Sequence, residues 1–254
     1  MSSIEEGMPA SAVDLQKDLL FPDLTKLCRS VIAEILSNRL PGATPSQKDV
    51  IQCKLGSRDL AAYLVSFVCP EIKHLQGKLV TRERLDIIKD LQVKDGNDWS
   101  GTSMGYLDYV TDSRNPGYIR MYVGQSLKAP RRLFSQHSQS MLKGDTSCLH
   151  YFVVWLGNGR RTASFIRLWE FPRGKGDSDT MGDIIQRNIL EAVLCRAFST
   201  HHGSLTICDE ESGLASGYGL NVMTPLAQAS AVGDYLQAVS KSQMAVSADP
   251  QIRY

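Results

Sequence analysis

The sequence predicts an α+β fold, in which a small antiparallel sheet is flanked by helices and follows an all-helical N-terminal unit. Three observations support this prediction. Apolar residues recur with helical spacing in the first hundred residues, two tyrosine-rich strand patterns lie within residues 105–126, and a long apolar helix pattern covers residues 183–198. Helices followed by neighbouring strands are typical of α+β domains, not of alternating α/β folds.

The N-terminal unit, residues 1–100, contains four predicted helices. The first covers residues 24–36, and Asp23 precedes it as an N-cap. The others are predicted over residues 47–51, 57–69 and 81–91. The unit has 13 basic and 14 acidic residues, so no charged patch marks it as a nucleic-acid binder. It favours a packing or interaction role with an unknown partner, and residues 96–104 are the predicted linker.

A hairpin and a helix follow the linker. Residues 106–110 and 118–124 are rich in tyrosine and in valine, isoleucine and leucine, and the turn between them contains Asn, Pro and Gly. A helix is predicted to start at Pro130, because proline is favoured in a first helical turn. Its apolar face carries Leu133, His137 and Met141.

Two more strands and one long helix complete the predicted domain, residues 101–228. Residues 150–156 and 163–171 are predicted as strands joined by an Asn-Gly turn. The helix over residues 183–198 is apolar around most of its circumference, with a polar stripe of Arg187, Asn188 and Glu191. Residues 229–254 are predicted to be a peripheral tail.

Composition places the chain among ordinary globular proteins. Of its 254 residues, 43% are apolar and 22% are charged. Its six cysteines have no paired spacing, no secretory signal opens the sequence, and no apolar run is long enough to span a bilayer. These features predict an intracellular protein of the cytoplasm or nucleus, not secreted and without a membrane partner.

Basic residues are concentrated around the hairpin. Residues 113–169 contain nine Lys or Arg and one acidic residue, Asp145, a net charge of +8. Such a segment attracts polyanions, and phosphate contacts supply most non-specific nucleic-acid affinity. A solvated surface is the alternative interpretation, but the position of the charge beside the tyrosines favours nucleic acid.

The hairpin resembles the GIY-YIG nuclease superfamily. Residues 122–126, Tyr-Val-Gly-Gln-Ser, match the second half of its signature, and Arg132 follows Tyr122 by ten residues, the family's offset for a helical arginine. For the first half, Tyr109 is our candidate tyrosine, and Tyr106, next to Gly105, is the competitor. Many members have a histidine four residues after the arginine, where this chain has Gln136 followed by His137.

The resemblance covers roughly residues 104–222 and implies a metal-dependent endonuclease acting on DNA, with RNA as an alternative substrate. It implies that Tyr109 orients or deprotonates water with the help of Tyr122, that Arg132 holds the phosphate, and that Glu191 binds Mg²⁺ or Mn²⁺. His137 is a candidate proton carrier, and Asn221 is expected to brace the site. Contacts to nucleic acid are expected from Arg120, Gln125, Ser126, Lys128 and Arg131.

Each residue also has a plainer interpretation. Tyrosines in strands are usually packing residues, His137 can be a satisfied core histidine, and Glu191 can form an exposed ion pair with Arg187. The alternative function is a catalytically inactive GIY-YIG-like module that binds nucleic acid or a protein. A metal-dependent endonuclease is the prediction that accounts for the order and spacing of the whole set.

Overall fold

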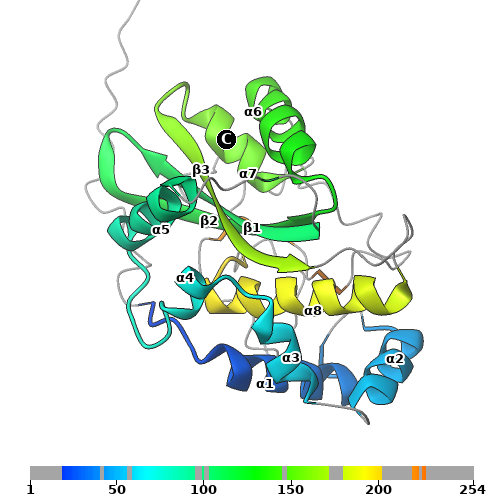
Figure 1. Ribbon diagram of the computed structural model, residues 1–254. Helices are drawn as coiled ribbons and strands as arrows, with labels where there is room; N and C mark the ends of the chain where they lie inside the picture. The colour runs from blue at the N-terminus through cyan, green and yellow to red at the C-terminus, as the bar shows by residue number, and fades with distance from the viewer. Residues whose placement is uncertain are drawn as a thin grey trace, which may run out of the picture.

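The computed structural model describes residues 19–40, 43–55, 59–94, 99, 103–144, 148–171, 180–201, 219–222 and 225–226. These residues form a three-stranded antiparallel sheet packed between helices, the predicted α+β arrangement (Figure 1). The strands are β1 (Ser103–Asp112), β2 (Asn115–Ser126) and β3 (Arg161–Phe171), with β1 in the middle. The predicted linker lies mostly, and the predicted tail entirely, outside the described residues.

Strands β1 and β2 form the predicted hairpin, and their register decides which side chains share a face. Tyr106 lies opposite Gly124. Asp108 lies opposite Tyr122. Because successive side chains of a strand point to opposite faces, Tyr106, Asp108 and Tyr122 share one face of the sheet. Tyr109 lies on the other face.

The segment predicted as the strand over residues 150–156 is a helix, so that prediction is wrong. Helix α7 spans Leu149–Leu156, and its first five residues are all buried. A short, continuous apolar run cannot distinguish a buried strand from a buried helix. The Asn-Gly pair that follows has positive φ angles, 47° at Asn158 and 80° at Gly159, and connects α7 to β3 instead of joining two strands.

Helices cover both faces of the sheet. In the part of the N-terminal unit that the structure describes, the four predicted helices are present together with one short additional helix: α1 (Leu24–Leu36), α2 (Pro45–Leu55), α3 (Leu60–Ser66), α4 (Pro70–Lys73) and α5 (Arg82–Lys94). The Asp23 side chain accepts a hydrogen bond from the backbone N–H of Lys26, which confirms it as the N-cap of α1. The long helix α8 (Met181–Ala197) starts at Thr180 with a capping box to Asp183.

Helix α8 lies between the sheet and the N-terminal helices α1 and α3 (Figure 1). The apolar residues of one sheet face, including Leu107 and Val123, belong to the same buried cluster as residues of α1, α3, α5 and α8. Arg196 of α8 binds Glu34 of α1 through two contacts of 2.9 and 2.5 Å. The N-terminal helices and the sheet therefore share one core.

The other face of the sheet is covered by helix α7 and by a π-helix, η1 (Arg131–His137), that continues as α6 (Ser138–Lys143). Figure 1 shows α6 and α7 on the side of the sheet away from α8. The predicted helix after Pro130 therefore exists, but its first turns are π-helical. Among the described helices, none combines the length and apolar composition that crossing a membrane requires.

Candidate functional site

The two candidate first tyrosines lie on opposite faces of β1. The Tyr109 hydroxyl donates a hydrogen bond to Asp86 Oδ1 of α5 at 2.6 Å. Burial and the hydrogen bond to Asp86 raise the pKa of Tyr109. The expected convergence of Tyr109 with Tyr122 does not occur, because the register places Tyr122 on the face that carries Asp108.

Tyr106 occupies the place expected for Tyr109. It is fully buried, and its ring centroid lies 6.4 Å from that of Tyr122. A Cβ atom added to Gly124 would lie 2.6 Å from Tyr106 Oη and 2.8 Å from Tyr122 Cε1. Only glycine leaves room for both phenols over this point of β2. The glycine of the Tyr-Val-Gly motif therefore has a steric role.

The π-helix η1 brings Arg132 and His137 to the same phenol. The hydrogen bonds of a π-helix join residues five apart, instead of four apart as in an α-helix. Arg132 and His137 are five residues apart and so lie about one turn apart. His137 Nε2 is 2.9 Å from Tyr106 Oη. Burial raises the pKa of Tyr106, and the Arg132 guanidinium opposes this shift.

Arg132 is half-buried among tyrosines. Burial alone would lower its pKa, but Tyr106, Tyr151 and Tyr122 raise it above the ordinary value. The guanidinium therefore keeps its positive charge although it is partly withdrawn from water. Burial also raises the pKa of Tyr122, and Arg132 opposes that shift as well. Both phenols are neutral at pH 7, with a fixed cation beside them.

A buried hydrogen-bonded chain continues from Tyr106 through His137. His137 Nδ1 is 2.8 Å from His150 Nε2, and His150 Nδ1 is 2.8 Å from Cys148 Sγ. Burial lowers the pKa of His137 to about 3, with a further contribution from Arg132. Burial also lowers the pKa of His150. Both imidazoles are therefore neutral at pH 7, each with one N–H and one lone pair.

Asp108 lies beside the two histidines. Its side chain is fully buried, and its Oδ2 atom is 3.7 Å from His150 Nε2. Neither carboxylate oxygen accepts a hydrogen bond from the part of the chain that the structure describes. Asp108, His137 and His150 each offer one atom that could bind a metal, and these three atoms all lie within 4.8 Å of one another. The Tyr122 ring stacks on His150 with a centroid distance of 4.3 Å.

Glu191 lies on α8 and is only 1% exposed. Gln125 Nε2 donates to Glu191 Oε2 at 2.7 Å and to Asn188 Oδ1 at 2.6 Å. Arg187 of the same polar stripe is also buried, at 6%, so the stripe is not an exposed edge. The side chains of Asn188 and Glu191 instead face Gln125 at the end of β2.

Although α8 covers the opposite face from Tyr106, the end of β2 connects the two sides. Gly124 contacts the Tyr106 phenol, and the next residue, Gln125, holds the Glu191 carboxylate. The negative charge of Glu191 adds to the effect of burial and raises the pKa of both Tyr106 and Tyr122. Glu191 therefore interacts electrostatically with the phenols, although it is sealed by Gln125.

Asn221 braces β2, as expected. Its Nδ2 donates to the carbonyl oxygen of Val123 at 2.8 Å, and its Oδ1 accepts from the Val123 N–H at 2.9 Å. The side-chain amide thereby satisfies both backbone groups of Val123 at the outer edge of the sheet. Because Val123 lies between Tyr122 and Gly124, this pair of bonds fixes the segment that carries the site.

The residues expected to contact nucleic acid differ in exposure. Lys128 and Arg131 are exposed, and Ser126 is half-buried. Gln125 is also half-buried, but its amide is committed to α8. Arg120 is only 7% exposed, and its guanidinium lies 5.7 Å from the Tyr118 ring centroid. Arg120 is therefore withdrawn from the surface on which Lys128 and Arg131 lie.

Sequence reasoning did not identify Asp108 or His150 as site residues. Asp108 interrupts an otherwise apolar strand, and a carboxylate at the centre of a buried strand is a signal that could have marked it. His150 was obscured because its segment was predicted as a strand. Its position two residues after Cys148 gives no recognisable metal-binding spacing.

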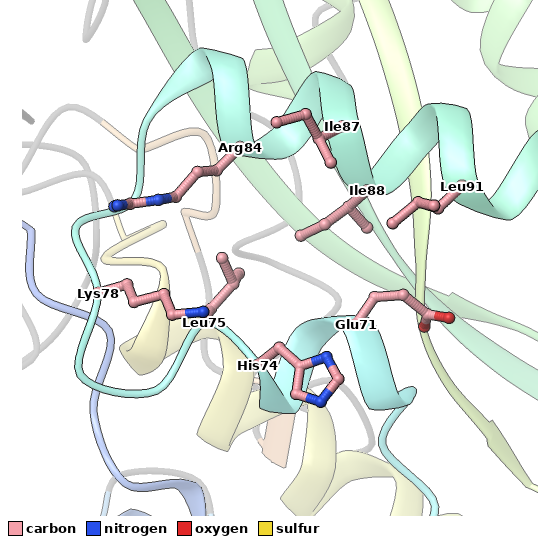
Figure 2. A pocket seen from close by; sticks show the side chains of 8 residues that line it. All are labelled: Glu71, His74, Leu75, Lys78, Arg84, Ile87, Ile88 and Leu91. Carbon is pink, nitrogen blue, oxygen red and sulfur yellow. The ribbon is translucent and has the colours of Figure 1, made fainter.

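A separate groove of about 180 Å³ lies between α4 and α5. In Figure 2, Ile87, Ile88 and Leu91 of α5 lie across from His74 and Leu75. The groove is lined by apolar and charged side chains: Glu71, His74, Leu75, Lys78, Arg84, Ile87, Ile88 and Leu91. None of the residues that surround Tyr106 and Tyr122 is among them. The groove therefore does not belong to the site at the hairpin.

Comparison with known proteins adds no assignment: no family model, no curated protein and no solved structure matches this chain.

Proposed function

We propose that the chain is a metal-dependent endonuclease of the GIY-YIG type, which hydrolyses phosphodiester bonds in DNA. One observation carries the proposal: two phenols, a guanidinium and a histidine gather over Gly124, while a single carboxylate lies beside Gln125. The residues in question are Tyr106, Tyr122, Arg132, His137 and Glu191. Tyr106 replaces Tyr109 as the first tyrosine of the proposed site.

In this proposal Arg132 binds the scissile phosphate. Its guanidinium is always charged and presents a planar fork that matches phosphate oxygens. It is only half-buried, so one side remains open to a ligand. Lys128 and Arg131, which are exposed on the same turn into η1, guide the nucleic-acid backbone by charge alone.

Tyr106 and Tyr122 orient the attacking water, and His137 receives a proton. A neutral His137 can accept the Tyr106 hydroxyl proton at Nε2, the atom that lies 2.9 Å from Tyr106 Oη. The proton then has a continuous path, because His137 Nδ1 is hydrogen-bonded to His150. The Arg132 charge favours the deprotonated phenol during the step.

The oxygen atoms around Glu191 fit a hard divalent cation. Glu191 offers a carboxylate and Asn188 an amide oxygen, and both now interact with the Gln125 amide. Mg²⁺ and Mn²⁺ prefer such oxygen ligands. When bound, the cation supplies phosphate polarisation and stabilises the leaving oxygen. Gln125 must release Glu191 Oε2 before that oxygen is available.

The burial of Glu191 favours a second candidate function, an inactive module that retains nucleic-acid or protein binding. A carboxylate that is 1% exposed and held by Gln125 has no access to a cation until the side chains rearrange. In that case Arg132, Lys128 and Arg131 serve binding only. The nuclease remains our conclusion because the binding module does not account for the grouping of Tyr106, Tyr122 and His137.

Nicking of supercoiled plasmid by the full-length protein with Mg²⁺ or Mn²⁺ tests the proposal. We expect wild type to nick the plasmid and Glu191→Gln to fall to background, because the substitution removes the only negative charge that the proposed site offers to the cation. Glu170→Gln is the matched control: Glu170 is a half-exposed carboxylate on β3 that pairs with Arg167, and this variant should keep full activity. Salt-sensitive DNA retention without metal-dependent nicking supports the binding module instead.

A further inference from the structure

We infer that Asp108, His137 and His150 form a Zn²⁺ site on the face of the sheet covered by η1 and α7. This site is distinct from the Glu191 carboxylate, and it does not depend on the proposed nuclease activity. A bound ion takes the lone pair of His137 Nδ1, so that His137 Nε2 then carries the hydrogen and donates it to Tyr106 Oη. The proton path through His137 and His150 described above therefore belongs to the metal-free chain. It joins three elements that are far apart in the sequence, since Asp108 is on β1, His137 on η1 and His150 on α7. Three independent features of the cluster support it.

The first feature is the convergence of donor atoms. His137 Nδ1 and His150 Nε2 are 2.8 Å apart, and Asp108 Oδ2 is 3.7 Å from the same nitrogen of His150. Two ligands of a tetrahedral Zn²⁺ are about 3.3 Å apart, given Zn–N bonds of about 2.0 Å. Shifts of about half an ångström in these two pairs would bring them to the tetrahedral spacing, and the ligand atoms of all three residues already lie within 4.8 Å of one another. The ion would take the place of the proton shared by the two rings.

The second feature is the support of the outer nitrogen of each histidine. His137 Nε2 is 2.9 Å from Tyr106 Oη, and His150 Nδ1 is 2.8 Å from Cys148 Sγ. Histidines that bind metals almost always use their second nitrogen in such a hydrogen bond, which fixes the ring orientation. Both rings are thus held with one nitrogen pointing into the cluster.

The third feature is the state of Asp108. Its carboxylate is fully buried, and no described residue donates a hydrogen bond to either oxygen. A buried carboxylate without a partner is costly, and buried charges in proteins are normally paired or bound to metals. A cation between Asp108 and the two histidines provides the missing partner.

The chemistry of the ligands favours zinc over the alternatives. Imidazole nitrogens are poor ligands for Mg²⁺ and Ca²⁺, and they suit zinc and the other late transition metals. Two histidines and one carboxylate also bind Fe²⁺, but such iron sites keep open coordination positions for oxygen and substrate. All three side chains here have an exposed fraction of 0%. The three side chains therefore leave no access for oxygen and substrate. With a water as the fourth ligand they would complete the tetrahedral coordination of a Zn²⁺, which would clamp η1 and α7 onto β1.

Metal analysis of the full-length protein tests the inference. We expect protein from zinc-supplemented cells, dialysed without chelator, to retain about one Zn²⁺ per chain by mass spectrometry of the metals. Asp108→Asn and His150→Gln should lose it. Cys148→Ser should bind about 10-fold to 100-fold more weakly, because it changes a second-shell partner. Glu191→Gln should keep the zinc, even if the nuclease proposal fails.

A wild-type measurement protects the test against variants that do not fold. Metal-free wild type titrated with Co²⁺ should develop the visible ligand-field absorption of a four-coordinate site, and Zn²⁺ should displace the Co²⁺ and raise the melting temperature. The inference is overturned if wild type retains no stoichiometric zinc, takes up iron instead, or shows neither the Co²⁺ spectrum nor stabilisation by Zn²⁺. In each of these cases Asp108 is a neutral acid beside a metal-free hydrogen-bonded chain.

Discussion

The two faces of the central strand β1 are both buried but chemically different. On one face Leu107 and Val123 join the apolar core with α8 and the N-terminal helices. On the other face the same strands present Tyr106 and Asp108, which lie against two histidines from η1 and α7. One face therefore contributes stability through apolar burial, whereas the other keeps buried polar groups whose removal from water costs free energy.

The contrast shows how apolar and polar side chains are divided between the two sides of one strand. Burying unpaired polar groups costs free energy, so the polar face requires support from elsewhere. That support is the apolar face, together with the Arg196–Glu34 contact that ties α1 to α8. Residues of β1 one position apart should consequently respond very differently to substitution.

The largest effect is expected on the apolar face. Leu107→Ala should lower the free energy of unfolding by about 2–5 kcal/mol, because it leaves a cavity in the core. Asp108→Asn, measured with chelator present, should change it by less than about 1 kcal/mol, because a buried carboxyl without a partner gains nothing from its acid group. Chemical denaturation compares the two. A larger loss at Asp108 than at Leu107 would contradict the comparison.

The next effect concerns adjacent arginines of η1. Arg132→Gln should reduce plasmid nicking by about 10²-fold to 10³-fold, the cost of removing a group that stabilises charge in the transition state. Arg131→Gln should leave the rate near wild type at saturating DNA and only weaken the salt-dependent binding. Rates and binding isotherms at two salt concentrations separate these outcomes. Equal loss of nicking in both variants would mean that the burial of Arg132 has no role in catalysis.

Gly124 tests the spacing of the phenols. Gly124→Ala places a methyl group 2.6 Å from Tyr106 Oη, so the ring must move. We expect a loss of about 1–3 kcal/mol in stability from overpacking, together with a marked fall in nicking. Thermal melts and rates should be measured on the same preparations. An alanine variant with unchanged stability and rate would show that the close approach of the phenols is not required.

The smallest effect is on the helical side. The hydrogen bonds from Arg196 lower the pKa of Glu34 below its ordinary 4.5, although burial acts in the opposite direction. Because the unfolded chain binds the proton more readily, this stabilisation is present above about pH 4.5 and is lost as the pH falls through the lower folded-state pKa. Glu34→Gln should remove less than about 1 kcal/mol above pH 5. Melting temperatures from pH 3 to pH 7 should converge with wild type at the acid end, and a constant difference would contradict the assignment.

Much of the fold could be predicted from local signals. The cap at Asp23 and the apolar spacing after it identified α1, and the tyrosine-rich strands identified the hairpin. The sequence predicts a strand where helix α7 lies, because a short run of apolar residues fits a buried strand and a buried helix equally well. The first five residues of α7 are all buried, so no polar position reveals the helical period. That error also concealed His150.

The candidate site could be predicted only in part, because its geometry depends on register. Tyr106 and Tyr109 are three positions apart, so they necessarily face opposite sides of β1. Which of them faces Tyr122 depends on pairing across a turn with a bulge near Thr111 and Asp112, and the sequence does not reveal it. The five-residue interval between Arg132 and His137 similarly makes structural sense only once η1 is known to be a π-helix.

The most direct test of this account is a comparison of Tyr106→Phe with Tyr109→Phe in metal-dependent plasmid nicking. Each variant removes one hydroxyl from the same strand, on opposite faces. We predict that Tyr106→Phe lowers the rate by about 10²-fold or more, whereas Tyr109→Phe retains nearly full activity and loses about 1 kcal/mol of stability with its bond to Asp86. Loss of nicking in Tyr109→Phe with an active Tyr106→Phe would contradict the account.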